Sequence, residues 1–164
     1  MLPEIVGRDE FAALIVRTAY EDEAAWRAVA EELSRPWGEE RKHEVEVHLV
    51  DDPVWAGATA EAVVAAVMGD EYLSVVFVAD DVTMKSAQHA LLALDPVAEE
   101  DEDLDPMYYQ ELIDSPPARE FRTVPAAVHE VHGNLSLGNM DFQEFAEAAL
   151  ADPERVLRPV DFRQ

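Results

Sequence analysis

The sequence predicts an α/β domain in which helices cover both faces of a mainly parallel, five-stranded sheet. Apolar residues make up 49% of the 164 residues, which is enough to form a buried core. Segments with strand-like and helix-like hydrophobic patterns alternate along the chain, as in folds built from strand–helix–strand crossovers. The length fits one domain over residues 1–164. We therefore expect a single three-layer domain.

Five segments have the composition of strands. Residues 11–17 and 73–79 are almost continuously apolar, which predicts central strands buried on both faces. Residues 44–50 alternate between apolar and polar side chains, which predicts an edge strand. Shorter strands are expected at residues 90–94 and at 121–124, the second of these as the last edge. These exposures predict the flavodoxin-like strand order 2-1-3-4-5, and a mixed sheet with one antiparallel edge strand is the alternative.

Capping residues mark the expected helices. Thr18 and Glu21 have the spacing of a capping box before the first helix. Thr59 is expected to cap a second helix, which ends at Gly69. A helical turn is expected from Pro125 to Gly133, where glycine would end it.

The last helix has the clearest signals. Asp141 and Glu144 form a second capping-box pattern, and the helix ends before Asp152. Its expected buried stripe consists of Phe142, Phe145, Ala146, Ala149 and Leu150. Residues 133–139, with two glycines and two asparagines, are interpreted as a connector, and a binding loop is the alternative.

The charge balance restricts the classes of partner. Asp and Glu number 36 against 12 Lys and Arg, for a formal net charge of −24, so we expect no binding to a nucleic-acid backbone. Residues 95–106 are mostly acidic and have no period, which predicts a mobile, solvated loop. The first residues lack the pattern of a secretory signal, and no apolar run approaches the roughly 20 residues of a membrane span. We therefore expect a cytoplasmic protein without membrane contact.

Polar side chains follow the first three expected strands, at the edge of an open α/β sheet where ligands bind. Carboxylates that meet there could hold a hard cation such as Mg²⁺. However, the stretch from Asp80 to Thr83 has no aspartate two residues after the first strand-end aspartate, as related phosphoryl-transfer sites have, and no well-placed lysine follows a late strand. The residues of this candidate binding rim are Thr18, Tyr20, Asp51, Asp52, Asp80 and Asp81.

Motifs for cofactors and nucleophiles are absent from the sequence. It contains no Walker A or Gly-x-Gly-x-x-Gly motif, no Gly-x-Ser-x-Gly and no cysteine, so we expect no cofactor and assign no catalytic residue. His129 and His132 are spaced to share a helical face, but without the zinc-protease pattern we interpret them as ordinary polar residues.

Two function hypotheses follow. The first is a non-enzymatic acidic interaction module, of the immunity or inhibitor type, that docks a basic protein partner. Trp37 and Trp55 lie in segments with Pro and Gly and are expected to be partly exposed as partner contacts. The second is a metal-dependent hydrolase or phosphoryl-transfer enzyme that uses the aspartates of the rim. We favour the first hypothesis.

Several stretches together resemble a family of small uncharacterised single-domain proteins that is common in actinobacteria. The resemblance covers most of the chain, and its last stretch is the most specific. It implies no activity, cofactor or catalytic residue, and the acidic loop is longer here than the resemblance leads us to expect. The stretches are residues 14–18 with 24–26, 50–53 with 56–57, 77–80, 121–125 and 134–146.

Overall fold

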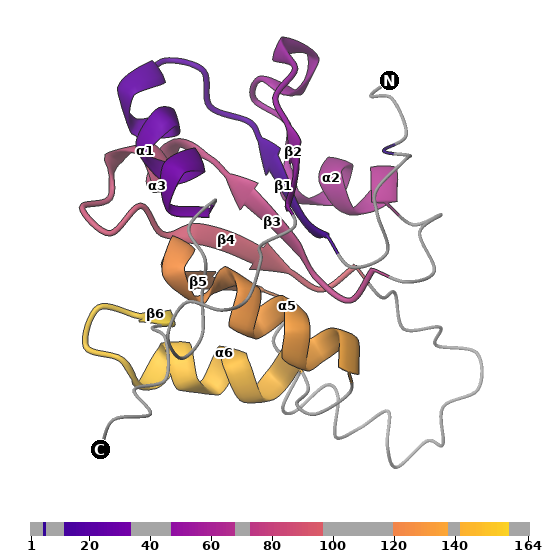
Figure 1. The fold of residues 1–164 in the computed structure, drawn as a ribbon, viewed down its shortest axis with the longest axis vertical. Coiled ribbons are helices and arrows are strands. Elements are labelled where there is room, and N and C mark those ends of the chain that lie inside the picture. Colours follow the sequence, from indigo (N-terminus) through magenta and orange to yellow (C-terminus); the bar gives the residue numbers. More distant parts are fainter. Residues whose placement is uncertain are drawn as a thin grey trace.

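A computed structural model describes residue 5 and residues 12–33, 47–67, 73–96, 120–137 and 142–157. Its sheet has six strands in the order β2-β1-β3-β4-β5-β6 (Figure 1). The strands are β1 (Ala13–Arg17), β2 (Val47–Val50), β3 (Val76–Ala79), β4 (Leu91–Leu94), β5 (Glu120–Thr123) and β6 (Val156–Leu157). The α-helices are α1 (Glu23–Leu33), α2 (Ala60–Val67), α3 (Asp81–Lys85), α5 (Val128–Leu137) and α6 (Phe142–Ala151), with the 3₁₀ turns η2 (Pro53–Trp55) and η4 (Pro125–Ala127).

Helices cover both faces of the sheet. Successive residues of β1 point to opposite faces, so Ile15 belongs to the buried cluster that includes α1, α5 and α6, whereas Leu14 belongs to the cluster that includes α2. Every residue of β1 is buried, because β2 and β3 flank it and helices cover it on both sides. The prediction of two central apolar strands is therefore confirmed for β1 and β3.

The first five strands follow the predicted order, but the predicted strand number and edge are wrong. β4 is antiparallel to both β3 and β5, so the sheet is mixed, and its antiparallel strand lies inside the sheet rather than at an edge. β6 pairs in parallel with β5, which is therefore not the last strand. A strand of two residues has too short a pattern to be recognised in a sequence.

Two helix boundaries differ from those predicted. Asp22, not Thr18, caps α1, because its carboxylate accepts a hydrogen bond of 3.0 Å from the amide of Ala25. α5 continues through Gly133 to Leu137, where Asn134 donates to the carbonyl of Glu130 over 2.8 Å. The connector expected at residues 133–139 is therefore helical as far as Leu137, and a binding loop there is excluded for that part.

Other local predictions are confirmed. The hydroxyl of Thr59 accepts a hydrogen bond of 3.2 Å from the amide of Ala62 and caps α2. Four residues of the predicted stripe of α6 are buried, but Leu150 is 57% exposed. Within the described ranges, no helix combines the length and apolarity needed to span a bilayer. Three predictions lie outside the described residues: the cap Asp141, residues 97–106 of the acidic loop, and the short helix expected near residues 107–113.

Candidate functional site

The strand directions place the predicted rim residues at one edge of the sheet. β1, β2, β3, β5 and β6 all point the same way, so their carboxyl ends lie along one edge, which we call the carboxyl edge. Thr18 and Tyr20 follow β1 at this edge, Asp51 and Asp52 follow β2, and Asp80 follows β3. The start of β4 lies there too, because β4 runs in the opposite direction.

Arg17, the last residue of β1, connects two acidic segments of the carboxyl edge. It is buried to 98%, and its guanidinium binds Asp51 over 3.1 Å and Glu23 over 2.7 Å. Its Nε also donates to the carbonyl of Ala19 over 2.9 Å. A guanidinium offers five donors in a fixed plane, so it can hold the loop before α1 and the end of β2 together.

Two aromatic rings enclose the same guanidinium. Its central carbon lies 4.1 Å from the ring centroid of Tyr20 and 5.2 Å from that of Trp26. These distances are within the range of cation–π attraction, which strengthens when the cation is removed from water. Arg17 is therefore fixed by hydrogen bonds in its plane and by aromatic rings around it.

The Tyr20 hydroxyl lies close enough to the Asp51 carboxylate for the two groups to interact. Burial and the nearby Asp51 carboxylate raise the pKa of Tyr20 to about 12, although the Arg17 guanidinium acts in the opposite direction. The buried Oη of Tyr20 has no hydrogen-bond partner of good geometry in the described part of the chain. The phenol therefore stays neutral at physiological pH.

Thr18 has a structural role at this edge. Its amide donates to the carbonyl of Ala79 over 2.9 Å, and its carbonyl accepts from Gly57 over 2.9 Å. Its side chain is buried, with the hydroxyl 3.5 Å from the same Ala79 carbonyl. Thr18 thus joins the ends of β1 and β3 to the turn after β2 and presents little surface to a ligand.

Asp80 forms a second arginine–aspartate pair. Its two carboxylate oxygens accept hydrogen bonds of 2.8 and 2.9 Å from Arg122 of β5. Asp80 also caps α3, because its carboxylate accepts from the amide of Thr83 over 3.1 Å. Burial alone would raise the pKa of Asp80, but the hydrogen bonds from Arg122 and Thr83 outweigh burial and lower it. Asp80 is therefore ionised, and its oxygens are occupied by hydrogen bonds within the fold.

The other aspartates of the rim face water. Asp52 and Asp81 are both exposed, and Asp52 uses one oxygen to accept the amide of Val54 over 3.1 Å. Val54 and Val82, their near neighbours, are 48% and 51% exposed. The carboxyl edge therefore combines exposed carboxylates with exposed apolar side chains.

The described carboxylates do not gather into a metal site. No group of three or more potential metal-ligating side chains occurs among the residues that the structure describes. Arginine side chains already pair with two of the acids at this edge, Asp51 and Asp80. Arg122 binds both oxygens of Asp80, so a cation would have to displace its guanidinium there, whereas Asp51 pairs with Arg17 through one oxygen.

The two tryptophans expected as partner contacts have different outcomes. Trp55 is only 2% exposed and packs between α2 and the sheet, so the expectation that its ring reaches a partner is wrong. Its ring is buried because η2 turns the chain back over β1 directly after β2. Trp37 lies outside the described residues.

The histidines expected to be ordinary polar residues are buried in α5. His129 and His132 are 7% and 6% exposed. Nε2 of His129 lies 2.9 Å from the carbonyl of Leu33 at the end of α1, so that nitrogen carries the hydrogen. Burial lowers the pKa of His129, although this hydrogen bond acts the other way.

Sequence reasoning missed the two arginines that organise the site. The signal for Arg17 is its place at the end of a fully apolar strand, which favours burial of the side chain, and a buried cation needs partners. Its partner Asp51 lies 34 residues away, and Asp80 lies 42 residues from Arg122, so no local pattern predicts which acid each arginine binds.

The chain also matches a known family model. Residues 12–160, which include every element described above, match the model of a domain of unknown function, DUF6924. The chain belongs to the DUF6924 family. The resemblance to an uncharacterised single-domain family is thereby confirmed, and DUF6924 carries no assigned activity that could be transferred to the carboxyl edge. No curated protein matches the chain.

Proposed function

We propose that this protein is a non-enzymatic interaction module that docks a basic protein partner on its carboxyl edge. The supporting observation is that several exposed acids surround the single buried cation of Arg17. The loop after β1 and the end of β2 present exposed carboxylates on both sides of one buried guanidinium. These carboxylates belong to Glu21, Asp22, Glu23, Asp51 and Asp52.

The ion pairs of Arg17 leave acidic surface for a partner. Glu23 and Asp51 keep 59% and 44% of their side chains exposed while they bind Arg17. Each carboxylate has two oxygens with several acceptor positions, so a lysine or arginine of a partner can bind the side that faces water. Arg17 holds these acids in place, which reduces the side-chain entropy that a partner's binding would cost.

Apolar contacts complete the proposed face. Val54 stands beside Asp52, and Val82 follows Asp81, each about half exposed. An interface needs an apolar centre as well as charges, because exposed charge pairs contribute more to association rate and specificity than to affinity.

A pair of matched variants tests the proposal. Glu21→Gln with Asp81→Asn removes two exposed charges of the carboxyl edge, and neither residue caps a helix or binds an arginine of the described chain. Glu144→Gln with Glu147→Gln removes the same charge from the exposed side of α6. Each protein is immobilised, and partners from the native lysate are captured at low and high salt and identified by mass spectrometry.

The expected result is a partner with more lysine and arginine than acidic residues, captured at low salt and lost at high salt. With the purified partner, the edge variant associates several-fold more slowly, while the α6 variant matches the wild type. The proposal fails if no basic protein is captured at low salt, or if both variants bind the partner equally well.

A further inference from the structure

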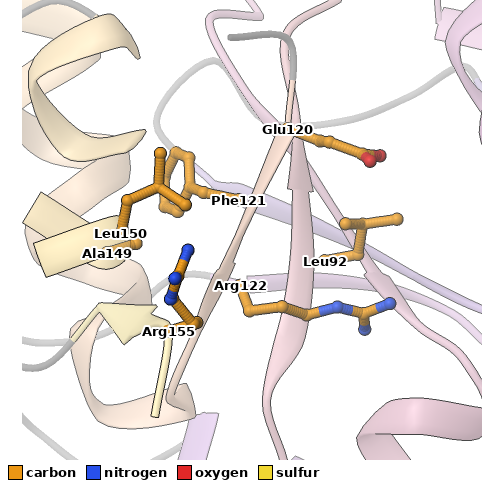
Figure 2. A pocket seen from close by; sticks show the side chains of 7 residues that line it. All are labelled: Leu92, Glu120, Phe121, Arg122, Ala149, Leu150 and Arg155. Atoms are coloured by element: carbon orange, nitrogen blue, oxygen red, sulfur yellow. The ribbon is translucent and has the colours of Figure 1, made fainter. Parts of the chain in front are cut away.

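A cavity of about 250 Å³ lies at the far side of the sheet from Arg17, beside β5 and α6 (Figure 2). β6 pairs only with Arg122 and Thr123, so among the described strands none pairs with the outer side of β5 at Glu120 and Phe121. The cavity opens at this step in the sheet. It shares only Arg122 with the site described above.

One side of the cavity is apolar. Phe121 and Ala149 are 6% and 2% exposed, and Leu150 of α6 stands beside them (Figure 2). Leu150 is 57% exposed, although the pattern of α6 predicts it in the buried stripe. A ligand seated against Phe121 would cover Leu150 and remove this apolar surface from water.

Arg155 places a positive charge on the apolar side. Figure 2 shows its side chain beside Leu150 and Phe121. Its guanidinium makes no ion pair with a described residue, although Asp and Glu outnumber the basic residues of the chain by 36 to 12. The acids next to it are engaged elsewhere: Glu154 binds the side chain of Gln88, and Asp152 accepts the amide of Glu154 over 2.8 Å.

The backbone at Arg155 is held in an unusual conformation. Its φ is +62°, in the left-handed region that glycine adopts without strain and that few other residues adopt. The turn that imposes it is closed by a hydrogen bond of 3.0 Å from the amide of Arg155 to the carbonyl of Asp152. Residues in such strained conformations occur often at binding sites, so the position of Arg155 favours a function for its side chain.

The other charged residues of the lining, Arg122 and Glu120, do not lie on the apolar side of the cavity. Arg122 binds both oxygens of Asp80, so its charge is already neutralised. Glu120 and Leu92 lie on the other side of β5 from Phe121 (Figure 2). On the apolar side, Arg155 is therefore the charged group of the described lining.

We propose that this cavity binds a small carboxylic acid with an aromatic or branched apolar group. The apolar group packs on Phe121 and Leu150, and the carboxylate binds the guanidinium of Arg155. The volume of about 250 Å³ is just below the range for ligand pockets, about 300–1,000 Å³, so the ligand is small. Phenylacetate has the required size and chemistry.

The test follows the amide and methyl resonances of the full-length protein by NMR during a phenylacetate titration. Phenylacetate is expected to shift the signals of Phe121, Ala149 and Leu150 in a saturable manner. Phenethylamine, which has the same ring with a positive charge, is expected to leave them unshifted. Arg155→Gly is expected to weaken phenylacetate binding roughly tenfold or more, because a charge-assisted hydrogen bond is lost.

Arg155→Gly also separates binding from folding. Glycine relieves the strain of the positive φ, so this variant is expected to unfold at the same temperature as the wild type or a higher one. The control is Arg27→Gln, which removes an exposed arginine from α1 and should not change binding. Glutamine is used there instead of glycine, because glycine inside a helix destabilises it. Absence of saturable shifts, equal binding of phenethylamine, or unchanged binding by Arg155→Gly would each overturn the proposal.

Discussion

Arg122 reaches past the start of β4 to bind Asp80 with two hydrogen bonds, of 2.8 and 2.9 Å. The same guanidinium donates to the carbonyl of Ala90, 3.3 Å away, just before β4. One side chain of β5 thus joins the ends of three neighbouring strands. This pair fixes the half of the carboxyl edge where the sheet changes from parallel to antiparallel.

The first prediction concerns Asp80. Asp80→Asn keeps a side chain that can cap α3 but loses the ion pair with Arg122, so we expect the free energy of unfolding at pH 7 to fall by about 2 kcal/mol. The exposed neighbour Asp81→Asn serves as the control and should change it little. Urea unfolding of the three proteins measures both values.

The pKa of Asp80 sets how that loss depends on pH. Because the pKa is lower in the folded chain than its ordinary value of 3.8, the unfolded chain binds the proton more readily. The contribution of Asp80 is therefore complete above pH 3.8 and is lost as the pH falls through the folded-state pKa. The difference between wild type and Asp80→Asn should shrink on acidification, and a constant difference would contradict the assignment.

The second prediction concerns Arg17. Lysine keeps the charge but cannot reach Asp51, Glu23 and the Ala19 carbonyl at once, nor stack between two rings. Arg17→Lys is therefore expected to lower the free energy of unfolding by about 2 kcal/mol. The two acids are partly exposed and can be hydrated again, which limits the loss. Arg27→Lys on the exposed side of α1 should be nearly neutral in the same unfolding experiment.

The third prediction concerns the Tyr20 phenol. Its Cζ resonance should titrate with a pKa of about 12, because burial and Asp51 disfavour the phenolate. Asp51→Asn removes the second of these causes, so the Tyr20 pKa should move down towards 10.0. A Tyr20 titration that is the same in wild type and Asp51→Asn would show that the two groups do not interact.

The fourth prediction concerns His129. Its lowered pKa means that below its ordinary value of 6.5 the unfolded chain binds a proton that the folded chain resists. Stability should therefore fall as the pH drops below 6.5. His129→Gln should reduce the slope of unfolding free energy against pH between 6.5 and 5.5, and an unchanged slope would contradict the burial of a neutral His129.

The fifth prediction concerns divalent cations. Because Arg122 binds both oxygens of Asp80, and the described residues include no group of three or more metal-ligating side chains, we expect Mg²⁺, Mn²⁺ and Ca²⁺ to leave the melting temperature of the protein unchanged. A cation that raises the melting temperature of the wild type but not that of Asp80→Asn would instead favour the metal-dependent hydrolase hypothesis.

The sequence predicted those parts of the fold that depend on local composition. The apolar runs of β1 and β3 and the alternation of β2 determine which strands are central and which is an edge. The direction of β4 could not be predicted, because its pattern of apolar residues is the same in a parallel and an antiparallel strand. The pairing of Arg17 with Asp51 depends on tertiary contacts between residues that are far apart in the chain.

The reversed direction of β4 also separates the β4–β5 connection from the carboxyl edge. Since β4 ends and β5 begins at the edge of the sheet opposite the carboxyl edge, the connection between Pro96 and Glu120 leaves and re-enters the fold there. A longer or shorter connection there would leave in place every strand end that carries Arg17 or Asp80. The same position suits a genetically inserted tag or reporter, with the acidic face on the opposite side left accessible.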